Sequence, residues 1–185
     1  MLILIAGVVI FFGVHLFSAC RSCRQRVIER IGEQRYTGFY VGGSVVGFML
    51  VVAGVPYAEF VHVYEPPAWG RQVTVMLMPL AFIMLAALLL PTNINRFTRH
   101  PMLWSFAIWS IAHLLSNGDL ASILLFGSFG VYSLFSMWSL TRRGARKSTD
   151  RRSLGSDALV ALAGVVAYIA VVYLHSDLFG VPAIL

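Results

Sequence analysis

The chain has 185 residues, of which 58% are hydrophobic and only 12% are charged, and its mean hydropathy is +0.79. Ordinary soluble domains are far more polar, so this composition excludes one and predicts an all-α, polytopic membrane helical bundle. The net charge of +6 is expected to face anionic lipid headgroups, and no nucleic-acid partner is expected.

Six apolar stretches approach the length of about 20 residues that a helix needs to cross a hydrocarbon core of about 30 Å. They predict six transmembrane helices: Leu2–Ala19, Gly38–Val55, Val73–Leu90, Leu103–Leu115, Leu120–Leu140 and Ala158–Leu174. The fourth stretch is short, but His100 and Pro101 can add a first turn, where proline is tolerated. Only residues 116–119 separate spans four and five, which predicts a tight antiparallel hairpin. Nothing charged precedes Arg21, so we expect the first stretch to be a retained helix and not a cleaved signal peptide.

The basic residues predict the orientation of the chain. Thirteen of the fourteen Lys and Arg residues lie in the loops after spans one, three and five, and only Arg71 lies on the other side. By the positive-inside rule these three loops are cytoplasmic and both termini are outside (N-out/C-out). We therefore expect a five-helix core (residues 1–143), a basic cytoplasmic linker (144–157), and a sixth transmembrane helix with a short outer tail (158–185).

Cys20 and Cys23 form a C-x-x-C sequence at the cytoplasmic end of span one. Arg24 follows Cys23, so the haem-attachment sequence C-x-x-C-H is absent, and no second pair of cysteines completes a zinc site. We interpret the two residues as reduced thiols at a helix end. A redox role is the alternative, because flanking arginines favour the thiolate.

The segment from Arg99 to Asp119 brings polar side chains into or beside an apolar helix. Ionisable groups at membrane depth are costly and tend to be functional. His113 shares one helical face with Trp109 and Asn117. We therefore expect any functional site to include this face, with Asp119 in the hairpin that follows.

His15 in span one and His113 in span four are candidate metal ligands. Neutral imidazoles on two helices of a bundle can hold a haem iron, and His100 at the start of span four is an alternative partner for His15. Interfacial arginines are candidate partners of the haem propionates: Arg21, Arg96 and Arg99. The simpler interpretation of each histidine is a hydrogen bond to a neighbouring helix. No Ser–His–Asp arrangement, intramembrane carboxylate pair or glycine-rich phosphate loop is present, so hydrolases and NTPases are not indicated.

Seven short segments carry a family resemblance: Gly13–His15, Ile31–Glu33, Gly38–Tyr40, Pro66–Trp69, Arg99–Met102, Ala112–Asp119 and Leu124–Ser128. With these segments the chain resembles the NnrU family of bacterial integral membrane proteins. The resemblance covers about residues 1–143, and its most specific part is the Asn-Gly-Asp hairpin after a buried histidine. It implies a multi-pass protein of the bacterial inner membrane with a role in denitrification, that is, in nitrite and nitric oxide metabolism.

The NnrU family is similar to ζ-carotene isomerase, a haem b membrane enzyme with histidine axial ligands. This similarity implies haem b as the cofactor and His15 as the likeliest carried-over ligand. Residues 130–135 contain no histidine, so the second ligand does not carry over. The implied activity is either redox chemistry or a haem-dependent isomerisation, which leaves open whether the protein is an enzyme. The implied partners are an apolar small molecule, or a redox partner at the basic cytoplasmic face.

Two alternatives remain. Arg99–Leu103 and the Asn-Gly-Asp hairpin also resemble isoprenylcysteine carboxyl methyltransferases, which implies S-adenosylmethionine as a cofactor. Those enzymes carry a Glu-Glu pair after the hairpin, whereas residues 132–143 contain no acidic side chain. A non-enzymatic transporter or assembly partner is the other alternative. A transporter would need polar residues along several spans, and only span four has such a stripe.

Overall fold

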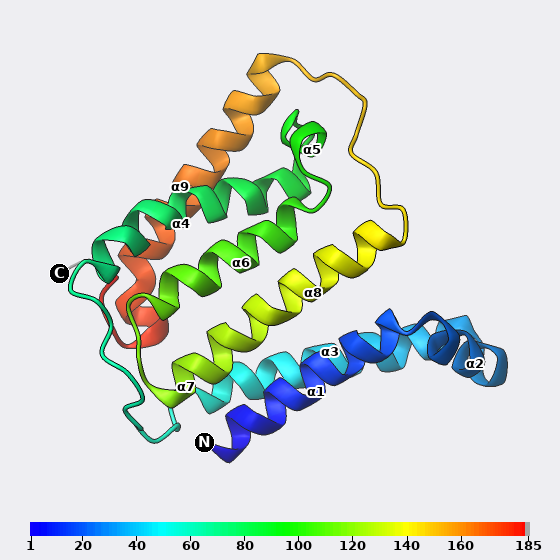
Figure 1. The fold of residues 1–185 in the computed structure, drawn as a ribbon, viewed down its shortest axis with the longest axis horizontal. Coiled ribbons are helices and arrows are strands. Elements are labelled where there is room, and N and C mark those ends of the chain that lie inside the picture. The colour runs from blue at the N-terminus through cyan, green and yellow to red at the C-terminus, as the bar shows by residue number, and fades with distance from the viewer. Residues whose placement is uncertain (184–185) are drawn as a thin grey trace. The chain divides into compact units, whose positions relative to one another are not determined.

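The computed structural model describes residues 1–183, and every regular element among them is a helix (Figure 1). The chain forms two compact units. Unit 1 holds Met1–Val63 and Asp119–Ser128, and unit 2 holds Tyr64–Gly118 and the chain from Phe129 onward. The expected five-helix core is thus divided between the units, and the expected linker belongs to unit 2. Residues 184–185 of the expected outer tail lie outside the described residues.

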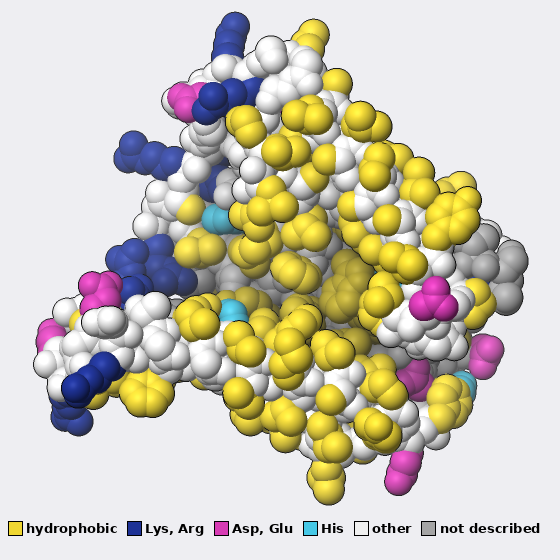
Figure 2. All heavy atoms as spheres, turned by 180° about the vertical axis from the view of Figure 1, so that it is seen from behind, with side chains coloured by type: hydrophobic (Ala, Val, Ile, Leu, Met, Phe, Trp, Pro, Cys, Tyr) yellow, Lys and Arg dark blue, Asp and Glu magenta, His cyan; other side chains and the backbone are white. Residues whose placement is uncertain are grey.

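Five helices among the described residues are long and apolar enough to cross a membrane. They are α1 (Leu2–Ala19), α3 (Glu33–Gly54), α4 (Gly70–Leu89), the helix Leu120–Arg142 and α9 (Leu154–Phe179). Large apolar side chains on these helices point outward, as Figure 2 shows for one face, and Leu89 is 79% exposed. Lipid tails are the natural cover for such side chains, so the chain is a helical membrane protein. The fourth expected span is the shorter α6 (Pro101–Leu114, 14 residues), which begins with Pro101 in its first turn as expected.

In unit 1 the helices α1 and α3 pack with their backbones in close contact. A Cβ atom on Gly47 would stand 2.6 Å from the backbone nitrogen of Phe11, and one on Gly7 would stand 2.5 Å from that of Val51. Small residues allow this approach, on which helix association in lipid depends. Leu4 and Val51 form the buried core there together with Ala121.

The segment between α1 and α3 was expected to be a loop, but it forms the short helix α2 (Arg21–Ile31), none of whose residues is buried. Cys20 separates α1 from α2 and is bonded to Cys23 in a disulfide. The interpretation of these cysteines as two reduced thiols is therefore wrong.

The fifth expected span is one continuous helix whose fourth to eighth residues are π-helical. It consists of α7 (Leu120–Ser122), the π segment Ile123–Gly127 and α8 (Ser128–Arg142). The Asp119 side chain caps its beginning by accepting hydrogen bonds from the backbone nitrogen of Ser122 (3.0 Å) and from its hydroxyl (2.6 Å). Capping of this kind explains why the helix starts directly after the hairpin.

Unit 2 is built around α4, which packs against α6 and α9. The carbonyl oxygen of Leu115, directly after α6, occupies the place where a Cβ of Gly70 would stand, so the end of α6 lies against the beginning of α4. The same kind of close approach joins Gly164 of α9 to Ile83 of α4. Between α4 and α6 the chain forms the single turn α5 (Ile94–Phe97).

Candidate functional site

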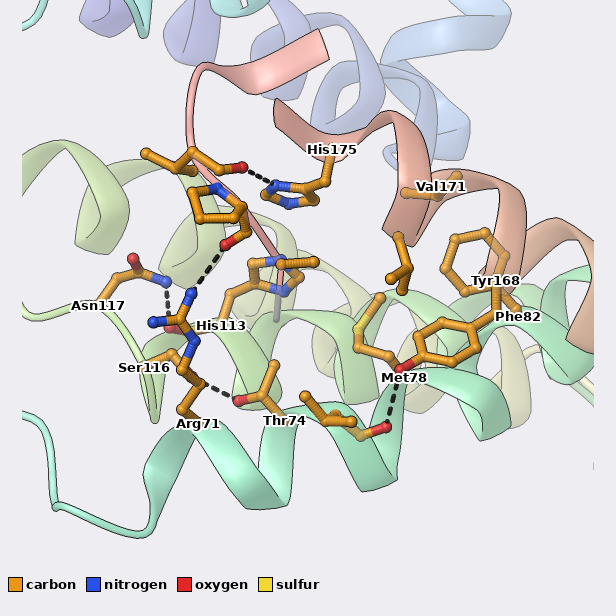
Figure 3. Close-up of a pocket in the computed structure, with 15 residues that line it drawn as sticks. Arg71, Thr74, Met78, Phe82, His113, Ser116, Asn117, Tyr168, Val171 and His175 are labelled. Carbon is orange, nitrogen blue, oxygen red and sulfur yellow. Dashed lines mark hydrogen bonds between the residues drawn. The ribbon is translucent and has the colours of Figure 1, made fainter. Parts of the chain in front are cut away.

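A pocket of about 410 Å³ lies within unit 2, at the end where α4 begins and where α6 and α9 end (Figure 3). Its volume is in the range of pockets that hold small organic ligands. The lining residues are Arg71, Thr74, Val75, Met78, Phe82, His113, Ser116, Asn117, Tyr168, Val171, Val172, His175, Val181, Pro182 and Ala183.

Hydrogen bonds between side chains and backbone hold the helix ends that form the pocket. The Thr74 hydroxyl on α4 lies 2.5 Å from the carbonyl oxygen of Ala112 and 2.6 Å from the Ser116 hydroxyl. The Asn117 amide donates to the carbonyl oxygen of His113 at 2.9 Å. Tyr64 donates from its hydroxyl to the carbonyl oxygens of Leu114 and Asn117. The carbonyls that end α6 thus find partners inside the protein, which fixes the wall carrying His113.

Two histidines line the pocket, His113 from α6 and His175 from α9. The His113 Nδ1 lies 2.9 Å from the carbonyl oxygen of Trp109, and the His175 Nδ1 lies 2.6 Å from that of Val181. A carbonyl oxygen can only accept, so each Nδ1 is the donor. In a neutral imidazole the lone pair is then on Nε2, as in metal-ligating histidines whose other nitrogen donates to a carbonyl.

The remainder of the pocket is apolar apart from one permanent charge. Met78, Phe82 and Val171 form much of its wall, and Arg71 on the first turn of α4 carries the charge. The Arg71 guanidinium donates to the carbonyl oxygen of Pro182 at 2.8 Å, which places it over the chain that follows α9. None of the described lining residues, which reach as far as Ala183, is a carboxylate, so this charge can meet an anionic group of a ligand.

The expected site residues of the segment 99–119 lie at different places. His113 and Asn117 line the pocket. Trp109 does not line it, although its ring centroid is 5.3 Å from that of His113. His100 precedes α6 at its opposite end, where its Nε2 lies 3.2 Å from the Thr141 hydroxyl, and Arg99 beside it is exposed. Partial burial, together with the Arg99 charge, lowers the pKa of His100 below its ordinary value. Neither His100 nor Arg99 lines the pocket.

The other two expected site residues belong to unit 1. The His15 Nδ1 lies 2.7 Å from the carbonyl oxygen of Phe11 on the same helix, and its ring contacts those of Phe11 and Tyr40 at centroid distances of 4.3 and 5.3 Å. Asp119 is the cap of α7 described above. Among residues 1–183, no group of three or more His, Cys, Asp and Glu side chains could hold a metal ion. A haem iron needs only one or two side-chain ligands, so a haem site stays a prediction.

Comparison with protein families gives one match, to the family described as NnrU protein, over residues 3–183. The chain belongs to the NnrU family. The NnrU match includes α9 and therefore extends beyond the residues 1–143 to which the sequence resemblance was assigned. No curated protein and no solved structure matches the chain.

Sequence reasoning missed several residues of the pocket in this NnrU protein, above all Arg71, Thr74, Tyr168 and His175. The sixth span was expected to end at Leu174 without an ionisable group, but α9 continues to Phe179 and includes His175. One signal was present in the sequence. Arg71 is the single Lys or Arg residue assigned to the outer side of the membrane. This departure from the positive-inside distribution could have indicated a functional role for Arg71.

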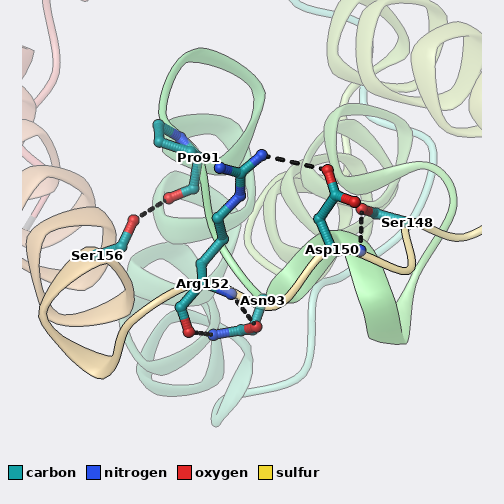
Figure 4. Close-up of polar contacts among 6 residues, drawn as sticks. All are labelled: Pro91, Asn93, Ser148, Asp150, Arg152 and Ser156. Carbon is teal, nitrogen blue, oxygen red and sulfur yellow. Dashed lines mark hydrogen bonds and ion pairs between the residues drawn. The ribbon is translucent and has the colours of Figure 1, made fainter.

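A second polar cluster in unit 2 lies where α4 ends and α9 begins (Figure 4). The Asn93 amide nitrogen donates to the carbonyl oxygen of Arg152 at 2.8 Å, and its oxygen accepts from the Arg152 backbone nitrogen at 3.0 Å. The Asp157 carboxylate accepts from the Thr92 hydroxyl at 2.6 Å and from the Asn93 backbone nitrogen at 2.8 Å. These groups satisfy one another, so the cluster joins two helix ends and is not a binding site.

Proposed function

We propose that this NnrU protein binds haem b in the pocket of unit 2, where His113 and His175 would hold the iron. We further propose that it serves redox or isomerase chemistry in the nitrogen-oxide metabolism of the bacterial inner membrane. Membership of the NnrU family supports the metabolic role. The observation that carries the cofactor is the presence of two imidazoles in one pocket, each with Nδ1 against a backbone carbonyl.

The residues of the pocket fit the chemical parts of haem b. Two neutral imidazoles suit its iron, the apolar wall with Met78 and Phe82 suits the macrocycle, and Arg71 suits a propionate. A carboxylate that meets a guanidinium gains charge-assisted hydrogen bonds. The same pocket is less suited to S-adenosylmethionine, because its lining within residues 1–183 has no carboxylate for the amino group or the sulfonium charge of that cofactor.

Each pocket residue has a separate task in this proposal. The carbonyls of Trp109 and Val181 orient the imidazoles of His113 and His175, and the valines of α9 keep water from the ring faces. When bound, haem b supplies one-electron chemistry at its iron. His15 belongs to unit 1, where its ring contacts Phe11 and Tyr40. A role of His15 as a haem ligand stays a prediction.

The topology that we propose has six crossings, N-out and C-out. In its support, the end of α6 lies against the beginning of α4, so the chain returns to the side of the membrane from which α4 started. At 1.5 Å per residue, the 14 residues of α6 extend only about 21 Å. This length is less than that of the other crossings, and Arg96 and Arg99 before α6 stay on the cytoplasmic side.

The test is the haem content of the purified protein and of single variants, expressed with an ample supply of haem and measured by absorption. His113→Ala is expected to lose most of the haem. His175→Ala is expected to convert a six-coordinate low-spin spectrum into a five-coordinate high-spin one. Arg71→Gln should retain the spectrum and weaken haem retention.

His100→Ala is the matched control, since His100 precedes the same helix but does not line the pocket. It should keep both the haem and the spectrum. The opposite result is loss of haem in His15→Ala together with full haem content in His113→Ala and His175→Ala. It would show that a ligand lies in unit 1 and would refute the assignment of haem to this pocket.

A further inference from the structure

The disulfide between Cys20 and Cys23 stands at the corner where α1 ends and α2 begins. Its Cα atoms are 5.3 Å apart, and the two residues are separated by only three positions. A disulfide stabilises a fold mainly by closing a long loop of the unfolded chain, so one that closes so short a loop contributes little. Stabilisation of the fold therefore does not explain this disulfide well.

The corner also keeps its geometry by other means. The backbone nitrogen of Arg24 donates to the carbonyl oxygen of Cys20 at 2.9 Å, which is the first hydrogen bond of α2. Both cysteines are half-buried and lie beside exposed residues of α2, so a reagent in solution can reach them.

The surroundings of the two sulfur atoms differ. The Cys20 sulfur accepts a hydrogen bond from the Cys23 backbone nitrogen at 3.4 Å and lies 3.5 Å from the Ser22 hydroxyl. Two donors next to this sulfur stabilise a thiolate on Cys20 and make it the better leaving group. Arg21 and Arg24 beside it line a shallow hollow with Ser22, Gln25 and Glu33, and the Glu33 carboxylate lies 3.9 Å from the Arg24 guanidinium. The two arginines outweigh this one carboxylate, so the hollow favours a thiol that carries carboxylates.

We propose that Cys20 and Cys23 are a thiol–disulfide exchange site that reacts with an anionic thiol, independently of any cofactor in unit 2. The incoming thiolate attacks the Cys23 sulfur, a mixed disulfide forms, and the bond to Cys20 breaks to release the Cys20 thiolate. A second thiol attacks the mixed disulfide. In total, two thiols lose two electrons and two protons and become a disulfide, and the protein disulfide becomes two thiols.

The charge pattern predicts that this corner is cytoplasmic, where disulfides that do form are mostly transient and catalytic or redox-sensing. The reactant must carry a thiol with carboxylates near it. A small tripeptide thiol and an acidic dithiol protein both meet this requirement. Glutathione is tested as the small thiol, and an acidic thioredoxin-type protein is tested as the dithiol protein. The reagent that reduces the disulfide faster identifies which kind of thiol the site takes.

The experiment equilibrates the purified full-length protein in detergent with glutathione buffers from fully oxidised to fully reduced. Alkylation and mass spectrometry then count the free thiols. We expect the pair to change from disulfide to dithiol within this range while the melting temperature stays the same. A pair that is reduced only after unfolding, that stays reduced in every buffer, or whose reduction lowers the melting temperature, overturns the proposal.

Variants test the assigned roles. Cys20→Ser should accumulate a mixed disulfide with glutathione on Cys23. Ser22→Ala should slow reduction several-fold, because the leaving thiolate loses one donor. The matched control is Thr37→Ala, which also removes an exposed hydroxyl but does not line the hollow, and which should leave the rate unchanged. Equal rates in Ser22→Ala and wild type would contradict attack at Cys23.

Discussion

The carbonyl oxygen of Leu115 lies against Gly70, in the space that a Cβ atom at that position would fill. This approach is possible only because residue 70 is a glycine, and it brings the last turn of α6 to the first turn of α4. His113 and Arg71 are carried on these two turns. The contact between the Leu115 carbonyl oxygen and Gly70 therefore brings His113 and Arg71 together at one end of the pocket.

Gly70→Ala should disturb this contact directly. Because the opposing atom belongs to the backbone, the two helix ends must move apart, and overpacking of this kind costs about 1–3 kcal/mol of unfolding free energy. We expect a lower melting temperature in detergent and reduced haem retention. Gly38→Ala on α3 is the control, since nothing lies within 4 Å of a Cβ placed there. Equal effects of the two variants would mean that the contact does not shape the pocket.

The membrane-spanning helices were predictable because hydropathy is a local property of the sequence. α1 was expected at its observed bounds, and α4 within a few residues of them. α2 was missed for a related reason. Its sequence from Arg21 to Ile31 is polar and lies between two apolar spans, which predicts a loop, but these residues form a helix that buries no side chain.

A second glycine pair tests the packing of unit 1. Gly47→Ala places a methyl group 2.6 Å from the backbone nitrogen of Phe11, whereas Gly42→Ala has no neighbour within 4 Å. The first variant should lose about 1–3 kcal/mol of unfolding free energy. The second should be neutral or gain up to about 1 kcal/mol from helix propensity. Thermal unfolding of both variants in one detergent checks this, and a stable Gly47→Ala protein would contradict the observed contact between α1 and α3.

Ser110 is a buried polar residue whose hydroxyl has no hydrogen-bond partner in the structure. Removing such a hydroxyl relieves a desolvation cost, so Ser110→Ala should raise the unfolding free energy by up to about 1 kcal/mol. The control is Ser133→Ala. Ser133 is equally buried, but its hydroxyl donates to the carbonyl oxygen of Phe129 at 2.7 Å. Only the first variant should melt at a higher temperature; a gain in both would point to helix propensity instead.

We predict a structural role for Asp157 in the polar cluster where α4 ends and α9 begins. Its carboxylate accepts hydrogen bonds from Thr92 and Asn93 and so holds the end of α4 against the beginning of α9. Asp157→Ala should therefore lower the melting temperature while leaving haem content per folded protein unchanged. The comparison is Asp150→Ala, because Asp150 forms only an exposed pair with Arg152 at 3.3 Å, and exposed pairs contribute little. A haem-free but stable Asp157→Ala protein would refute the structural interpretation.

The candidate site was only partly predictable. His113 and Asn117 share a face of one helix, and helical spacing is enough to show that. Arg71 and His175 reach the pocket because of how α4, α6 and α9 pack together and because of where α9 ends. Local sequence patterns do not predict either of these features. His175 lies directly after Leu174, where the sixth apolar stretch ends, whereas the helix continues to Phe179.

The central claim is that two histidines of unit 2 bind haem b, and the spectrum of the purified wild-type protein tests it most directly. Protein expressed with ample haem is purified in mild detergent, and its absorption is recorded in the oxidised and the dithionite-reduced state. We expect a Soret band, and on reduction the sharp α and β bands of low-spin, bis-histidine haem b. A spectrum without a Soret band, from folded protein under these conditions, would contradict the claim.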